Sequence, residues 1–108
     1  MIETGFKQDY EGAFAEKDPV AELTYTVDWV DWLPQGATIS NSTWTLETIT
    51  GDAAPLVNEG SLIATAKTLI TISGGTLNKV YSVYNTITTN AGLIDRRYFR
   101  LKIKARTL

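Results

Sequence analysis

The feature that most constrains the fold of this chain is a period-two pattern of polar and apolar residues near its end. Residues 81–87 and 99–103 each repeat with a period of two, and Asn90-Ala91-Gly92 between them is a turn sequence. Successive side chains of a strand point to opposite faces of a sheet, so this period places one face on a core and the other in water. The two segments are predicted to form a β-hairpin.

Weaker signals of the same kind run through the rest of the chain. Residues 23–29 alternate with the same period, and residues 38–48 do so except for a change of phase near Asn41-Ser42, which predicts a β-bulge. The remaining expected segments are short strands at 61–66 and 69–72 and a loop at 50–60. No helix longer than two turns is indicated. About seven short strands with this turn spacing predict an all-β chain folded as an immunoglobulin-like antiparallel β-sandwich.

The beginning of the chain shows no clear period. It is expected to form an N-terminal extension or arm over residues 1–15, ordered by a neighbouring protein, and the sandwich domain would follow at 16–108. Phe6, Tyr10 and Phe14 recur every four residues, so a short amphipathic helix is the competing interpretation. In either form, these three aromatic side chains are candidate interface residues.

The three tryptophans are assigned from their positions relative to the expected strands. Trp29 continues the series of apolar residues at alternate positions of its strand, so its side chain is predicted to lie in the core. Trp44 is expected to pack in the core as the buried tryptophan of an immunoglobulin domain does. Trp32 lies beyond a strand end and is expected to be exposed, where it could anchor a protein partner or stack on a sugar.

The chain lacks the residues on which most catalytic sites depend. It has no histidine and no cysteine, which excludes Ser-His-Asp and Cys-His nucleophilic sites and most zinc sites. Asp28 and Asp31 flank Trp29, and they could form a glycosidase pair or bind calcium. Two solvated acids near a strand end are the preferred interpretation. We predict no enzymatic activity, no cofactor and no metal.

Charge is distributed unevenly along the chain. Eight of the 12 acidic residues lie within the first 31 positions, and six of the ten basic residues lie between positions 96 and 106. The preferred interpretation is that the first and last strands are neighbours; the alternative is that acidic and basic faces meet between subunits. Arg96, Arg97, Arg100 and Lys102 are therefore candidate interface residues. A net charge of −2 argues against nucleic acid, and no apolar run reaches membrane-spanning length.

Several motifs follow one another in a fixed order along the chain. The motifs are Lys17-Asp18-Pro19, Leu23-x-Tyr25, Asp28-Trp29, Trp32-Leu33, Thr38-Ile-Ser-Asn-Ser-Thr-Trp44-Thr45, Ser73-Gly74-Gly75-Thr76, Tyr81-x-Val83-x-Asn85 and Asp95-Arg96-Arg97-Tyr98. In this order and spacing they resemble a family of small virion proteins of tailed phages, and the resemblance covers about residues 17–104. The chain differs from the family pattern in the extension before Lys17 and in Leu77-Asn78 after the glycines.

The resemblance implies a function that neither composition nor periodicity shows. Its relatives are described as fiber–tail adaptors or small tail and neck components. It implies a non-enzymatic virion protein assembled in the host cytoplasm, which docks tail, neck or fiber subunits and copies of itself. A carbohydrate-binding module associated with the capsid or a fiber, working through Trp32, is the alternative.

Overall fold

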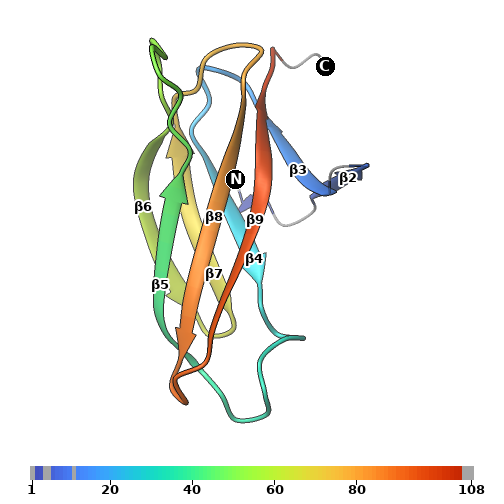
Figure 1. Ribbon diagram of the computed structural model, residues 1–108, viewed down its shortest axis with the longest axis vertical. Coiled ribbons are helices and arrows are strands. Elements are labelled where there is room, and N and C mark those ends of the chain that lie inside the picture. The colour runs from blue at the N-terminus through green and yellow to red at the C-terminus, as the bar shows by residue number, and fades with distance from the viewer. Residues whose placement is uncertain (1, 4–5, 11, 106–108) are drawn as a thin grey trace.

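The protein is a two-layer β-sandwich. The computed structural model describes residues 2–3, 6–10 and 12–105, and within these ranges it contains nine strands and no helix (Figure 1). One sheet has the order β1-β4-β7-β6: β1 Ile2–Glu3, β4 Leu23–Asp28, β7 Lys67–Ser73 and β6 Val57–Ala64. The other has the order β2-β3-β9-β8-β5: β2 Lys7–Asp9, β3 Gly12–Lys17, β9 Ile94–Ile103, β8 Val80–Thr89 and β5 Ile39–Leu46.

The alternation predicted from the sequence determines which side chains fill the space between the sheets. Every second residue of β8, from Tyr81 to Thr89, is buried, and so are Phe99, Leu101 and Ile103 of β9. In the opposite sheet, β4 and β7 bring Tyr25, Ile70 and Ile72 into the same core. The register of β8 and β9 pairs Tyr81 with Leu101 and Val83 with Phe99, so the inward faces of the hairpin match. The predicted all-β sandwich is confirmed.

The pairing of the strands differs from the expected purely antiparallel arrangement. β1 pairs with β4, and β3 pairs with β9, in the parallel direction. Parallel strands are not joined by tight turns, so the turn sequences of the chain do not predict these two pairings. The described residues also hold nine strands instead of about seven, because β1, β2 and β3 occupy the predicted arm. An immunoglobulin-like topology within this sandwich stays a prediction.

The segment expected to be an irregular arm or a short helix consists of strands where it is described. β3 spans the boundary predicted between residues 15 and 16, and Ala15 is buried in the core. The ring of Phe6 packs against that of Phe99, with 4.6 Å between the centroids. Pairing with β9 gives this segment strand structure that its own sequence does not specify. The division into an extension at 1–15 and a domain at 16–108 stays a prediction.

Two local predictions in the middle of the chain were wrong. Trp44 is half-buried rather than core, because β5 is the last strand of its sheet and covers the interior from one side only. The fully buried tryptophan is Trp29. The expected loop at 50–60 ends early, since β6 begins at Val57. A register shift between Asn58 and Gly60 breaks the alternation that would have revealed this strand.

The glycines that follow β7 pack at one end of the sandwich, where Gly74 contacts the loop at Pro55 and the end of β3 at Lys17. Gly74 has a φ of +79°, and a Cβ on it would lie 2.4 Å from the backbone oxygen of Pro55. Its own carbonyl accepts a 2.6 Å hydrogen bond from Nζ of Lys17. The Ser-Gly-Gly-Thr motif is therefore a packing requirement, since the chain needs a residue without a side chain here.

We expect Gly74→Ala to lower the free energy of unfolding by about 2–4 kcal/mol, because it combines a left-handed backbone with a clash against backbone. Gly36→Ala is the matched control. Gly36 has a φ of +81°, but a Cβ added to it would meet nothing within 4 Å. The loss in this variant therefore measures the cost of the left-handed backbone conformation alone. Urea denaturation of both variants measures the difference. Equal losses in the two would show that contact with Pro55 carries no energy.

Candidate docking surface

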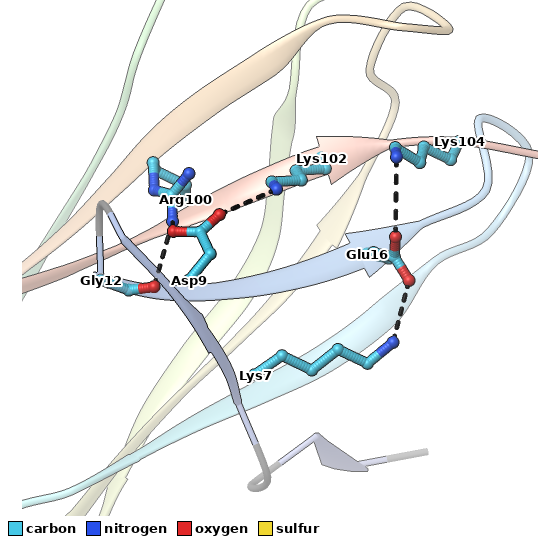
Figure 2. Close-up of polar contacts among 7 residues, drawn as sticks. All are labelled: Lys7, Asp9, Gly12, Glu16, Arg100, Lys102 and Lys104. Atoms are coloured by element: carbon cyan, nitrogen blue, oxygen red, sulfur yellow. Dashed lines mark hydrogen bonds and ion pairs between the residues drawn. The ribbon is translucent and has the colours of Figure 1, made fainter.

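The charged ends of the chain meet within the molecule, where β2 and β3 cover the C-terminal half of β9. Asp9 accepts hydrogen bonds from Arg100 and, at 3.1 Å, from Nζ of Lys102 (Figure 2). Glu16 pairs with Lys7 at 3.1 Å and with Lys104 at 4.0 Å. The charges at the two ends of the chain therefore balance within the molecule, as the preferred interpretation expected. The strands beside β9 are, however, β2 and β3, and the strand predicted to be first lies in the other sheet as β4.

Three of the predicted interface residues form part of this intramolecular contact. Nζ of Lys102 lies 3.9 Å from the ring centroid of Phe14, and the guanidinium of Arg100 lies 5.7 Å from it. Arg100 also donates a 3.0 Å hydrogen bond to the carbonyl of Gly12 and so holds the turn between β2 and β3. A docking role for Phe14, Arg100 and Lys102 remains a prediction, and it would have to coexist with these contacts.

The other aromatic candidates lie in three different environments. Phe6 is half-buried against the core, whereas Tyr10, beside the turn between β2 and β3, is 94% exposed. Trp32 is half-buried rather than exposed. Its ring meets that of Trp29 edge-on at 5.6 Å, because the turn after β4 folds back on the core. The structure therefore does not bring Phe6, Tyr10 and Trp32 into one surface.

The N-terminal half of β9 carries the remaining two candidates. The guanidinium of Arg97 lies 4.4 Å from the ring centroid of Trp29 and donates a 3.2 Å hydrogen bond to the carbonyl of Asp28. The guanidinium of Arg96 lies 4.9 Å from the ring centroid of Tyr84. Among the described residues, no carboxylate is within ion-pair distance of either arginine. This end of β9 therefore presents two cations that have no acidic partner in the described part of the chain.

A surface cluster that the sequence analysis did not identify surrounds Arg96. Tyr84 and Tyr98 face each other across β8 and β9 on the outer side of the sheet, with ring centroids 5.2 Å apart. Tyr98 is 53% exposed, and Ile94 on the same outer face is 67% exposed. We call Tyr84, Ile94, Arg96 and Tyr98 the tyrosine–arginine patch. Counting outward from the predicted turn at 90–92 would have placed Tyr84 opposite Tyr98.

The carboxylates considered for catalysis or calcium binding are not part of this patch. Asp28 and Asp31 are both exposed, and Oδ1 of Asp28 accepts a 2.9 Å hydrogen bond from the backbone N–H of Val30. Within the described ranges, no three histidine, cysteine, aspartate or glutamate side chains are grouped as metal ligands would be. The local hydrogen bond suits an acid that shapes the turn after β4.

A different carboxylate has a perturbed environment. Asp52 accepts hydrogen bonds from the hydroxyls of Thr76 and Tyr81, and these bonds hold the pKa of Asp52 below its usual value. Burial, followed by the hydrogen bond to Asp52, raises the pKa of Tyr81. Thr76 belongs to the Ser-Gly-Gly-Thr motif and Tyr81 to β8. The network therefore fastens the loop before β6 to the start of β8, which is a structural role.

Two comparisons bear on the identity of the chain. No curated protein matches it. The model of one family matches residues 17–102, from the Lys-Asp-Pro motif through almost the whole of β9. Separately, no helix in the described residues could cross a membrane. The family match covers well over half of the sequence, so the chain belongs to the podophage GP4 fiber-tail adaptor protein gp77 family, a family of structural phage proteins.

Proposed function

We propose that this protein is a non-enzymatic connector of the phage tail or neck that docks a fiber or a neighbouring tail protein through its sheet surface. The observation that carries the proposal is the tyrosine–arginine patch on the outer face of β8 and β9. Tyrosine and arginine are the residues in which interface hot spots are enriched. The family description, a fiber-tail adaptor, supports the same function.

The patch is arranged before any partner arrives. Arg96 lies over the ring of Tyr84, and that ring packs against Tyr98, so three long side chains already restrict one another. Ordering such side chains on binding costs about 0.5–1.5 kcal/mol each, and a patch that is ordered in advance avoids much of this cost. Tyr98 and Ile94 remain exposed beside them. The surface combines rigidity with apolar area, as a docking site requires.

The patch alone is too small for a stable complex, which needs about 800 Å² from each partner. A second contact is therefore part of the proposal. β2 lies to one side of the sandwich in Figure 1, and Tyr10, which follows it in the chain, is exposed. We assign β2 and Tyr10 to contact with a second virion protein or with another copy of this chain, in a particle assembled in the host cytoplasm.

The experiment is complementation of a phage that lacks this gene. We expect particles without the protein to lack fibers or tails in electron micrographs. The variant Ile94→Ser/Tyr98→Ser should reproduce this defect while melting at nearly the temperature of the unmodified protein. Val57→Ser/Leu62→Ser is the matched control, since it replaces two exposed apolar residues of β6 in the other sheet. Complete, infectious particles made without the gene would contradict the proposed function.

The carbohydrate-binding alternative depends on Trp32 and stays a prediction. Trp32 is half-buried against Trp29, so its ring is not displayed as a free stacking surface. Glycan-array binding by the purified protein that disappears in Trp32→Ala would favour this alternative over the connector.

A further inference from the structure

Half of one edge of β9 has no neighbouring strand in the described structure. β3 pairs with β9 only from Arg100 to Ile103, whereas β8 pairs with it from Ile94 to Lys102 on the other side. β3 extends no further because Gly12, with a φ of +109°, directs the chain into β2. The edge of β9 from Ile94 to Phe99 is therefore open where a continuing strand would lie.

A groove lies beside this open edge, between the two sheets. Its volume is about 280 Å³, and it is lined by Arg97, Tyr98 and Phe99 from β9 and by Thr26, Val27 and Asp28 from β4. Phe6 and Ala13 border it on the side of β2 and β3. The groove thus occupies the position into which β3 would extend if the chain did not turn at Gly12.

The backbone of this edge lacks the hydrogen-bond partners that a continuing β3 would supply. An extended segment laid in the groove would offer its carbonyl and N–H groups to the edge of β9.

The charges along β9 indicate which segment would fit. In the covered half, the basic side chains of β9 are neutralised by Asp9 and Glu16, which β2 and β3 supply. In the open half, Arg96 and Arg97 have no carboxylate partner among the described residues. A strand of another protein that pairs with this half of β9 should therefore supply acidic residues, as β2 and β3 do for the half from Arg100 onward.

We propose that the open edge of β9 accepts an extended acidic segment of a neighbouring virion protein, which joins the five-stranded sheet as an additional strand. This inference rests on the proposed connector function and specifies how one partner is held. Backbone hydrogen bonds to the edge would give affinity, and the two arginines would select acidic segments. A second copy of this chain is a poorer occupant, because its own Asp9 and Glu16 are already paired internally.

Amide hydrogen exchange on purified particles and on the free protein tests the proposal. We expect amides between Ile94 and Phe99 that point away from β8 to exchange at least about tenfold more slowly in the particle. Amides of β6, the edge strand of the other sheet, are the internal control and should change little. Protection of Ile94–Phe99 in concentrated purified protein alone would show that a second copy fills the edge, and would overturn the proposal.

Charge reversal tests the acidic character of the partner. Arg96→Glu should reduce incorporation into particles by about tenfold or more, a loss equivalent to about 1.4 kcal/mol of binding free energy. Lys67→Glu makes the same charge change at an exposed lysine of β7 and should leave incorporation unchanged. Equal incorporation of the two variants would overturn the proposal.

The outcomes separate this inference from the function on which it rests. If the protein is present in particles but the amides of Ile94–Phe99 exchange as fast as in the free protein, strand addition is wrong and the connector function stands. If the protein is absent from complete particles, the connector function itself fails.

Discussion

Trp29→Ala is expected to lower the free energy of unfolding by about 3–5 kcal/mol, a large part of the 5–15 kcal/mol typical of a domain this size. Trp29 is 0% exposed and is the largest of the fully buried side chains. Its indole N–H donates to the hydroxyl of Thr68 and to Oδ1 of Asn85, both at 3.1 Å. Truncation would create a cavity and also remove a donor from a buried polar network.

That network connects both sheets, which is why we expect so large an effect. Thr68 belongs to β7 and donates a 2.6 Å hydrogen bond to Asn85 of β8. The amide nitrogen of Asn85 donates to the hydroxyl of Ser42 and to the carbonyl of Thr43 in β5. Three strands from two sheets are therefore joined through Trp29 and Asn85. Buried polar groups of this kind cost most when one member is removed and the others stay.

Urea denaturation followed by circular dichroism measures the loss. Trp44→Ala is the control, because Trp44 is half-buried at the edge of the same sandwich and should cost clearly less. Trp29→Phe keeps most of the volume but loses the indole donor and one ring, so its loss should lie between those of the two alanine variants. A Trp29→Ala protein as stable as Trp44→Ala would show that the core does not depend on Trp29.

Lys17→Met is the second substitution with a large expected effect, about 2–3 kcal/mol of destabilisation. The Lys17 side chain is fully buried, and its Nζ donates to the carbonyl of Asp18 at 2.9 Å and to that of Gly74 at 2.6 Å. Methionine keeps the length and the apolar stem but donates nothing, so both carbonyls lose a charged partner. Lys7→Met, at an exposed surface ion pair, is the control and should cost no more than about 1 kcal/mol.

The same variant has a pH signature. Burial lowers the pKa of Lys17 below its ordinary value of 10.5, although Asp18 and Glu22 oppose the shift. Between the lowered pKa and 10.5 the unfolded chain binds more protons than the folded one, so Lys17 makes stability rise with pH in that window. Denaturation midpoints measured from neutral pH up to pH 10.5 should lose this contribution in Lys17→Met. A pH dependence identical to that of the unmodified protein would contradict it.

The contact between Lys17 and Gly74 also explains two of the motifs noted in the sequence. Lys-Asp-Pro and Ser-Gly-Gly-Thr are far apart in the chain, yet one side chain and one carbonyl join them. From the sequence, a lysine beside an aspartate is expected to be a solvated surface residue. Its acceptor is a backbone group, and backbone groups have no sequence signature.

The strands with an unbroken period were predictable because their alternation reflects a single buried face. β4, β8 and β9 occur where the sequence indicated, and the phase change near Asn41 appears as a register shift in β5. β6 was predicted to begin at residue 61 instead of Val57, because its side chains are exposed on both faces and Glu59 bulges out of register. β2 and β3 were missed because they depend on β9, a partner distant in sequence.

The candidate docking residues show the same limit. The sequence shows directly that these residues are basic. It does not show that Asp9 neutralises Arg100 and Lys102, whereas Arg96 and Arg97 have no ion pair within the described ranges. That distinction depends on where β3 stops along β9, and a glycine at position 12 determines it. Periodicity locates elements, whereas pairing between distant segments decides which charges remain available.

The central position of β9 in its sheet has a consequence for how the molecule is made. β3 and β8 do not pair with each other, because β9 lies between them in the sheet although it follows both of them in the chain. Until β9 has been synthesised, the translated portion has two disconnected half-sheets and an incomplete interior. Contacts as distant in sequence as Phe14 with Arg100 are slow to form. Any fragment of the chain that stops before β9 should therefore stay incompletely folded, and such fragments should be degraded instead of accumulating as partly folded subunits.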